Sequence, residues 1–379
     1  MTMQLNRRHF SIATAAAATL GGFGIARAQG DTPLVLGQSA PFTGPAAQLG
    51  IQFHQGAKLF LDQYNAQPGQ RDVVIKNLDD GYEPDRCAAN TQKLIGEDVF
   101  ALFGYIGTPT SLAALPLAVK DKVPFIAPFT GAMSLREPFH RNVFHLRASY
   151  NDETALMVKQ LTHLGMKKIA VFYQNDAYGK AGLDGVTLAL AQQELKPVAL
   201  ATVERNSADV AAAVKTIMAS QPAAVVQVGA YKACAAFIRE MRKAGYGGVF
   251  FNLSFVGTQA LADELGKEAA GVMVTQVVPS PYNQANALAR EFTEAVRKAG
   301  GGASANFSSM EGYLAAKVLT EGLRRAPGGK GTRDGLIAGL ESIERQQFGG
   351  FEVSFSSKSH VASKFVELSM LTGDGRVRT

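Results

Sequence analysis

A strand–helix–strand pattern within residues 101–135 constrains the fold of this chain more than any other stretch. A short apolar run at residues 101–103 precedes a helical pattern over residues 110–121, and a second apolar run follows at residues 124–127. Parallel strands need a crossover of this kind, and open α/β sheets bind ligands at the loops that follow the carboxyl ends of their strands. The pattern therefore predicts a parallel sheet with two ligand-facing loops side by side.

Hydroxyl side chains gather in these two loops. Thr108, Thr110 and Ser111 stand where the helix begins, and Thr130 follows the second strand. A helix start has backbone N–H groups without internal partners and a partial positive charge, so hydroxyls there form a small anion site that suits a carboxylate. Alternatively, Thr108 or Thr110 only caps the helix. Because a second hydroxyl-bearing loop is expected beside the first, we favour a binding role for these hydroxyls over helix capping alone.

The first 28 residues resemble an export signal. A twin-arginine pattern, N-R-R-H-F-S at residues 6–11, precedes a small-residue apolar stretch and an A-R-A sequence at residues 26–28. The apolar stretch is too short and too rich in alanine for a stable membrane span, although an uncleaved anchor is the alternative. No cysteine stands near the cleavage point, which argues against a lipid anchor there. We therefore expect a twin-arginine-type signal peptide at residues 1–28 and a mature protein in the periplasm.

The charge of the chain gives no sign of a nucleic-acid partner. The formal net charge is +6, and it falls to +3 once the three arginines of residues 1–28 are removed. This charge is spread along the chain without a basic run that could follow a phosphate backbone. The cysteines, Cys87 and Cys234, fall on different predicted helices; an exported protein permits a disulfide, but we expect two buried thiols.

The sequence lacks the common signatures of catalysis. Its six histidines show no metal-ligand spacing, and it has neither a G-x-S-x-G elbow nor a Walker loop. No G-x-G-x-x-G follows the first predicted strand. The neighbours Asp79 and Asp80 could form a carboxylate pair, but we expect Asp80 to brace its own loop. The chain is therefore predicted to have no catalytic residues, no metal and no cofactor.

The strand–helix alternation occurs in two series of similar length, which predicts an α/β protein with two lobes. In the first series, strands are expected at residues 32–39, 73–78, 101–103, 124–127 and 143–146. A helix capped by Asn151 or Asp152 opens the second series, whose strands are expected at residues 169–173, 198–202, 223–228, 249–252 and 272–277. Helices at residues 286–299, 309–325 and 332–340 should pack back on the first lobe. A strand pair near residues 351–355 and 365–371 ends the chain.

This order predicts a chain that passes between the lobes more than once. We assign residues 29–147 and 279–347 to lobe 1, and residues 148–278 and 348–379 to lobe 2. The crossings would lie near residues 146–151, 276–280 and 347–351, and together they would form a multi-strand hinge.

Seven short segments, in this order and spacing, carry a family resemblance. They are G-Q-S-A-P-F-T-G at 37–44, D-D-x-x-x-P at 79–84, and residues 104–111, 128–131, 146–147, 176–179 and 229–231. The chain resembles the leucine/isoleucine/valine-binding proteins, the periplasmic solute-binding components of ABC importers. The resemblance implies the type I periplasmic binding fold, in which two Rossmann-like lobes with parallel sheets are joined by a three-crossover hinge. It also implies a monomer that closes over a small molecule and delivers it to a permease.

The same resemblance implies which residues line the site. A ligand carboxylate would be held by Thr108 and by the loop Phe129-Thr130-Gly131, whose hydroxyl stands one place earlier than in the family. Tyr231 would contact the ligand from the second lobe. The other expected lining residues are Tyr150 and Tyr178 on cleft loops, Tyr82 and Phe307 as aromatic walls, and Ser254. Each aromatic residue has plain packing as its alternative role.

Ser254 is the departure from the family that bears most on the ligand. The family has at this position an acidic residue that pairs with the ligand ammonium, and a serine cannot neutralise a buried ammonium. Gly107 likewise stands where one cysteine of a family disulfide would be. An amino acid, an aromatic or aliphatic carboxylate and an amide are therefore all open as ligands, and we favour a carboxylate with an apolar or aromatic body. The alternative function is a sensor that presents such a molecule to a receptor or regulator.

Overall fold

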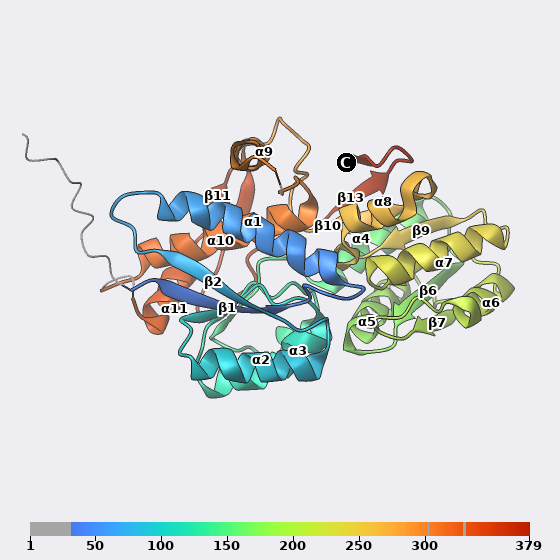
Figure 1. Cartoon of the computed structure of the whole chain (residues 1–379). Coiled ribbons are helices and arrows are strands. Elements are labelled where there is room, and N and C mark those ends of the chain that lie inside the picture. Colours follow the sequence, from blue (N-terminus) through green and yellow to red (C-terminus); the bar gives the residue numbers. More distant parts are fainter. Residues whose placement is uncertain (1–31, 302, 329–330) are drawn as a thin grey trace, which may run out of the picture.

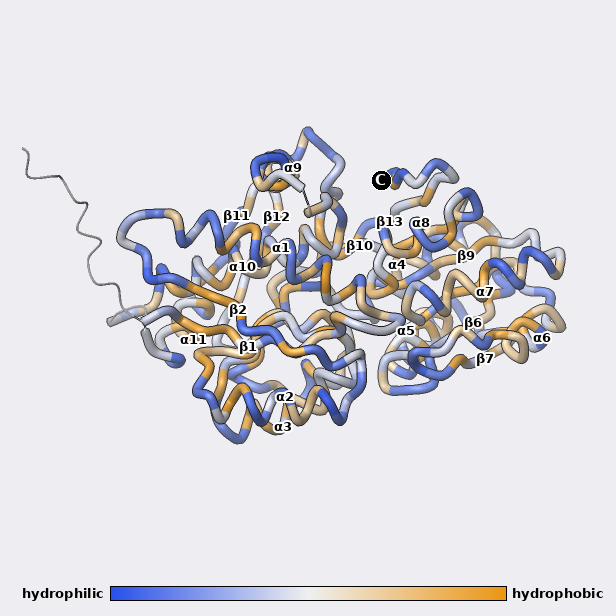
Figure 2. Tube along the Cα trace, viewed as in Figure 1, coloured by the Kyte–Doolittle hydropathy of each residue, from blue (hydrophilic) through white to orange (hydrophobic). Residues whose placement is uncertain are grey.

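Two α/β lobes lie side by side in the computed structural model, which describes residues 32–301, 303–328 and 331–379 (Figure 1). The signal peptide predicted at residues 1–28 lies outside the described residues. Each lobe is built on its own sheet with helices packed on it, so the predicted two-lobed α/β architecture is confirmed. Figure 2 shows hydrophobic segments gathered along the sheets and hydrophilic segments at the outer turns, as expected when burial of apolar surface drives folding.

The first sheet is parallel throughout and has the strand order β2-β1-β3-β4-β5. Its strands are β1 (Leu34–Ala40), β2 (Val73–Asp79), β3 (Ala101–Phe103), β4 (Phe125–Ile126) and β5 (Val143–Phe144). The crossover helices are α1 (Ala47–Asn65), α2 (Pro84–Gly96) and α3 (Thr108–Lys120). Because β3 and β4 are neighbours, the two loops that follow them emerge side by side, as predicted.

The second sheet has seven strands in the order β14-β13-β10-β9-β8-β6-β7. The parallel ones are β6 (Ile169–Gln174), β7 (Leu200–Val203), β8 (Ala224–Val228), β9 (Val249–Asn252) and β10 (Met273–Gln276). The helices of this lobe are α4 (Tyr150–His163), α5 (Ala177–Ala191), α6 (Ala211–Ala219), α7 (Tyr231–Lys243) and α8 (Thr258–Leu265). A short 3₁₀ turn at Ser254–Val256 follows β9.

The late helices pack on the first lobe, which confirms that prediction. They are α9 (Ala287–Ala299), α10 (Phe307–Arg325) and α11 (Arg333–Glu341), and α10 lies along α1 and against α11 (Figure 1). Two glycines permit the close approach of α1 and α10. A Cβ atom on Gly56 would lie 1.8 Å from the carbonyl oxygen of Ser309, and one on Gly312 would lie 2.0 Å from that of Phe53. Larger side chains at either position would force the helices apart.

The prediction that residues 351–355 and 365–371 pair with each other is wrong. β12 (Phe351–Val353) pairs with β11 (Gln346–Phe348), whereas β13 (Glu367–Leu371) pairs with β10 and with β14 (Val377–Arg378). Gly349 and Gly350 have φ angles of 63° and 99° and form the two-residue turn between β11 and β12. Glycine pairs favour such hairpins because they adopt positive φ without strain, so the local sequence itself carries the signal for this turn.

The predicted cap of α4 is also wrong. Ser149, rather than Asn151 or Asp152, is the N-cap, and its hydroxyl accepts from the backbone N–H of Asp152 at 3.1 Å. The Asp152 carboxylate in turn accepts from the backbone N–H of Ser149 at 3.0 Å. This is a capping box, in which the acidic residue occupies the third helical position instead of the cap.

Three further findings bear on function. Cys87 and Cys234 are free and buried, as expected. Across residues 32–301, 303–328 and 331–379, no helix combines the length and apolarity that a membrane crossing requires. In the same ranges, no three His, Cys, Asp or Glu side chains are grouped as metal ligands. The residue boundaries assigned to the two lobes stay predictions.

Candidate functional site

The two hydroxyl-bearing loops meet in the interior of the protein. The Oγ1 atoms of Thr108 and Thr130 lie 2.7 Å apart, and both residues are fully buried. The loops are also joined through backbone, since the N–H of Gly107 donates to the carbonyl of Phe129 at 3.3 Å. Thr108 is the first residue of α3, and no side chain caps that helix. Its hydroxyl therefore faces the neighbouring loop instead of serving as a cap.

Thr110 has a different role from Thr108. Its hydroxyl donates to the carbonyls of Ile106 and Gly107, at 2.5 and 3.1 Å, and so holds the loop that leads into α3. A threonine bonded back to the preceding turn in this way is common in helices. Gly107 has a φ of 99°, and a Cβ atom there would lie 2.2 Å from the ring of Tyr82. Glycine at this position lets the Tyr82 ring pack directly against the binding loop.

An aromatic cluster between the lobes surrounds these hydroxyls. Phe255, on the turn after β9, has its ring centroid 5.8 Å from those of both Tyr82 and Phe129 on the opposite lobe. It also lies 4.4 Å from the ring of Tyr178, which in turn lies 5.5 Å from that of Tyr150. All five side chains are at most 1% exposed. We call Tyr82, Phe129, Tyr150, Tyr178 and Phe255 the inter-lobe cluster.

The phenol hydroxyl of Tyr178 has no hydrogen-bond partner within the described residues, whereas that of Tyr150 interacts with the hydroxyl of Thr130 and the backbone of Gly131. The hydroxyl of Tyr82 accepts from the side-chain amide of Gln174 at 3.3 Å across the lobes. Burial raises the pKa of all three phenols, so each keeps its proton near neutral pH. Buried polar groups normally find partners, and the Tyr178 hydroxyl is therefore a donor that a ligand could satisfy.

A buried ion pair borders the cluster. Arg147 is 1% exposed and donates from Nε and Nη2 to the carboxylate of Glu311, at 2.8 and 2.7 Å. The guanidinium carbon also lies 3.8 Å from the ring centroid of Phe129, in cation–π contact. Burial would lower the pKa of Arg147, but the charge and hydrogen bonds of Glu311 raise it above its ordinary value. Arg147 therefore stays protonated, and the carboxylate of Glu311 balances its charge.

Ser254 belongs to this polar network. Its hydroxyl accepts from Nη1 of Arg147 at 3.2 Å and donates to the carboxylate of Glu153 at 3.0 Å, to which its backbone N–H also donates at 2.8 Å. Thr275 donates to the same carboxylate at 2.5 Å. Burial raises the pKa of Glu153, while Arg147 opposes that rise. All of these polar groups already have partners inside the protein.

The loop after β2 is fixed by its two aspartates, which confirms the bracing role expected for Asp80. That carboxylate accepts from the hydroxyl of Ser39 and the backbone N–H of Tyr82, both at 2.8 Å, and burial raises its pKa to about 6. Asp79 accepts from the backbone N–H groups of Phe42 and Gly81, and these and other hydrogen bonds outweigh its partial burial and lower its pKa to about 2. The aspartates thus position the Tyr82 ring.

Polar contacts also join the lobes at the exposed edge of this region. Arg205 donates to the carboxylate of Glu83 at 2.9 Å, and Asn206 donates to Glu83 at 2.7 Å and to the carbonyl of Gly81 at 3.0 Å. Arg205 and Asn206 follow β7 of the second sheet, whereas Gly81 and Glu83 follow β2 of the first. The two lobes are therefore in contact around the inter-lobe cluster.

The predicted site residues do not all join the cluster. Gly131 does lie against it, because a Cβ atom there would be 2.5 Å from the Tyr150 ring. Tyr231 begins α7 and is buried, and the ring of Phe307 contacts Tyr282 at a centroid distance of 5.9 Å. Within the described residues, no ring-to-ring contact joins Tyr231 or Phe307 to the cluster. The ligand-binding role of every predicted residue stays a prediction.

Sequence reasoning missed four residues that shape this region. Phe255, Glu153 and Glu311 had no predicted role, and Arg147 was predicted only as part of a family motif. A phenylalanine beside Ser254 offered a weak local signal, since it follows a strand of the second lobe at the same sheet edge. Nothing local identifies Glu311, which lies 164 positions from Arg147 in the sequence.

Comparisons with known proteins agree with this architecture. A family model described as "Periplasmic binding protein" matches residues 33–375. The chain is 26% identical to Leu/Ile/Val-binding protein homolog 3 of Brucella melitensis over 314 residues, which cover 82% of this chain and 83% of the relative. It is also 34% identical to a possible leucine/isoleucine/valine-binding protein from Rhodopirellula baltica. The crystal structure of that protein matches with a TM-score of 0.84, and the match covers 92% of this chain and 97% of that one.

A solute-binding protein from R. palustris, solved in complex with benzoate, shares the fold. Its TM-score is 0.81 at 21% identity, and the match covers 92% of this chain and 95% of the other.

Proposed function

Since the chain belongs to the periplasmic binding protein family, we propose that it is the substrate-binding component of an ABC importer. It captures a small carboxylate with an aromatic or apolar body between its lobes and delivers it to a membrane permease. The periplasmic character of the family and the signal peptide predicted at residues 1–28 support its placement in the periplasm. It is proposed to act as a monomer and without catalysis.

The observation that carries this proposal is a set of buried hydroxyls gathered around aromatic rings. Thr108 and Thr130 pair with each other across the two loops, Thr130 also interacts with one backbone N–H and with the phenol of Tyr150, and the phenol of Tyr178 has no partner within the described residues. Hydroxyl groups are the donors that a carboxylate needs, and the rings of the inter-lobe cluster suit an apolar body.

The charges around the cluster favour an acid over an amino acid. A buried ammonium requires a carboxylate partner, and the two buried carboxylates near Ser254 are already engaged. Glu311 accepts two hydrogen bonds from Arg147, and Glu153 accepts from Ser254 and Thr275. The relatives carry Leu/Ile/Val-binding names, so leucine is the competing ligand class, and the benzoate complex shows that this fold can hold an aryl acid.

The test is a calorimetric titration with benzoate, benzamide and leucine against the wild type and Thr108→Val. We expect benzoate to bind and Thr108→Val to weaken it at least about tenfold, because a hydrogen bond to a charged group is lost. Thr216→Val is the matched control, since among the described residues the Thr216 hydroxyl bonds only to the carbonyl of Ala212 in the same helix, at 3.0 Å. Tight leucine binding without benzoate binding would overturn the acid assignment. Equal benzoate affinities of Thr108→Val and Thr216→Val would show that Thr108 does not belong to the site.

A further inference from the structure

The loop that follows β7 holds a carboxylate of the opposite lobe. Arg205 and Asn206 lie in this loop, and Glu83 lies in the loop that follows β2. Nη2 of Arg205 donates to one carboxylate oxygen of Glu83 at 2.9 Å, and Nδ2 of Asn206 donates to the other at 2.7 Å. The same Nδ2 atom also donates to the carbonyl of Gly81 at 3.0 Å. We call Glu83, Arg205 and Asn206 the latch.

Arg205 is also bonded to a carboxylate of its own lobe. Its Nη1 atom donates to Asp176 at 3.2 Å. Asp176 is the N-cap of α5, and its other carboxylate oxygen accepts from the backbone N–H of Tyr178 at 2.9 Å. Glu83 directly follows Tyr82 in the chain. One guanidinium therefore joins the segments that carry Tyr82 and Tyr178, two members of the inter-lobe cluster.

A buried amide connects the same carboxylate to the cluster directly. Gln174 is 2% exposed, and its Nε2 atom donates to Asp176 at 2.6 Å and to the phenol oxygen of Tyr82 at 3.3 Å. A continuous path of hydrogen bonds thus runs from Arg205 through Asp176 and Gln174 to Tyr82. Satisfied networks of this kind hold their side chains rigidly. The position of Arg205 therefore affects the position of the Tyr82 ring.

The latch is partly shielded from water. The side chain of Arg205 is 24% exposed and that of Glu83 is 42% exposed. Burial would lower the pKa of Arg205, but the hydrogen bonds and charges of Glu83 and Asp176 raise it above its ordinary value. Charge-assisted hydrogen bonds are strong, although water weakens those of an exposed carboxylate. Breaking the latch should therefore shift the equilibrium between joined and separated lobes about five- to tenfold.

We propose that Arg205 is a positioning residue of the inter-lobe site and that the latch slows the release of the bound molecule. This inference rests on the proposed function, because it takes the ligand to be held between the lobes. The latch contacts join protein atoms on both sides, so they favour joined lobes with or without a ligand. Release requires the lobes to separate, which breaks the contacts of Glu83. The latch therefore acts on dissociation much more than on association.

Stopped-flow tyrosine fluorescence with benzoate tests the effect on release, since the chain has ten tyrosines and no tryptophan. Glu83→Ala and Arg205→Ala should each raise the dissociation rate constant about five- to tenfold and leave the association rate constant within about twofold. In the double variant, the rise should be smaller than the product of the two single effects, because both changes break the same ion pair.

Glu268→Ala is the matched control. Glu268 pairs with Arg239 at 2.9 Å within one lobe, and these side chains are 45% and 34% exposed. The latch would be overturned if Glu83→Ala speeds release no more than Glu268→Ala does. Single effects that multiply in the double variant would also contradict the proposed pairing.

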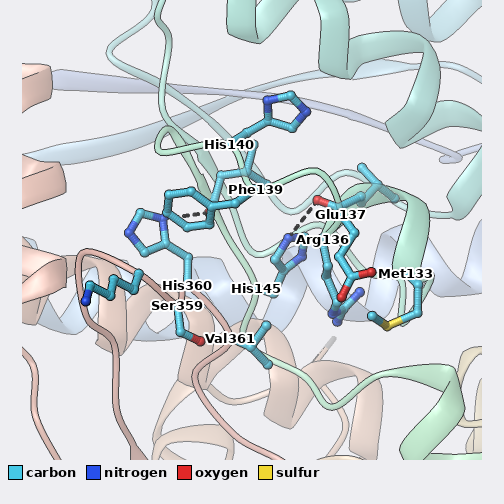
Figure 3. A pocket seen from close by; sticks show the side chains of 12 residues that line it. Met133, Arg136, Glu137, Phe139, His140, His145, Ser359, His360 and Val361 are labelled. Carbon is cyan, nitrogen blue, oxygen red and sulfur yellow. Dashed lines mark hydrogen bonds between the residues drawn. The ribbon is translucent and has the colours of Figure 1, made fainter.

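A cavity away from the latch provides a control on where benzoate binds. It lies between residues 133–145 and residues 358–361 (Figure 3), and none of its lining residues belongs to the latch or to the inter-lobe cluster. Ser359→Trp should fill this cavity from its exposed rim and leave the benzoate affinity within about twofold. Loss of benzoate binding in this variant would overturn both the proposed site and the effect of the latch on release.

Pulsed electron paramagnetic resonance tests the latch without any ligand. Spin labels at Gln92→Cys and Lys215→Cys occupy exposed positions on α2 and α6, the helices that follow the two sides of the latch, and both native cysteines are buried. In Glu83→Ala, the ratio of long to short distances should rise at least about fivefold, with no change in Glu268→Ala. Identical distance distributions in the two variants would overturn the latch. If benzoate fails to bind the wild type, the proposed ligand class is wrong, and this measurement still decides the latch.

Discussion

The buried pair of Arg147 and Glu311 gives the sharpest quantitative prediction. Glu311→Gln keeps the size of the side chain but removes the charge that neutralises a guanidinium only 1% exposed. Breaking a buried ion pair on one side costs about 3–5 kcal/mol, because the remaining charge is left uncompensated. At about 2 °C per kcal/mol for domains of this size, the Tm should fall by about 6–10 °C. Glu153 is too well occupied by Ser254 and Thr275 to replace the lost partner.

Differential scanning calorimetry of ligand-free protein measures this effect. The matched control is Asp62→Asn, which breaks the ion pair between Asp62 and Lys58. Both of these side chains are 60% exposed, and exposed ion pairs contribute about 0–1 kcal/mol. The double variant Arg147→Met/Glu311→Leu should recover most of the loss, because apolar residues can replace a buried pair at little cost. The reasoning is refuted if Glu311→Gln lowers the Tm no more than Asp62→Asn does. A double variant as unstable as Glu311→Gln would also contradict it.

Two further predictions concern the loops that surround the cluster. Burial raises the pKa of Asp80 from 3.8 to about 6. Between these two pH values the folded state therefore binds more protons than the unfolded state. The free energy of unfolding should then fall by about 3 kcal/mol as the pH rises through this interval. Asp80→Asn should abolish this slope in urea titrations between pH 4 and pH 6, roughly the interval between the two pKa values; a slope that persists would assign it to another group. Gly107→Ala should cost at least about 2 kcal/mol in the same titrations, since its φ is 99° and the new Cβ would meet the Tyr82 ring. Gly69→Ala is the control with positive φ and open space around it, and equal losses in both variants would exclude the ring contact as the cause.

Much of this protein follows from local sequence alone. Apolar periodicity predicted the strand–helix–strand unit of residues 101–135, because each strand and helix repeats its buried positions at a fixed spacing. The same unit explains why Thr108 and Thr130 lie 2.7 Å apart, since neighbouring parallel strands deliver their loops to one edge. The expectation that Asp80 braces its loop also needed only nearby residues, namely the turn at Gly81 and Tyr82.

Other features depend on segments that meet only in three dimensions. The partner of Arg147 lies 164 positions away on α10, and the pairing of β13 with β10 joins strands separated by nearly a hundred residues. That Nε of Arg136 and Nδ1 of His145 have no partner within the described residues is likewise visible only once every neighbouring atom is placed. Periodicity reports which face of an element is buried, but it does not report what that face is buried against. Partner choice depends on packing and charge compensation across the whole fold, and these are properties of the tertiary structure.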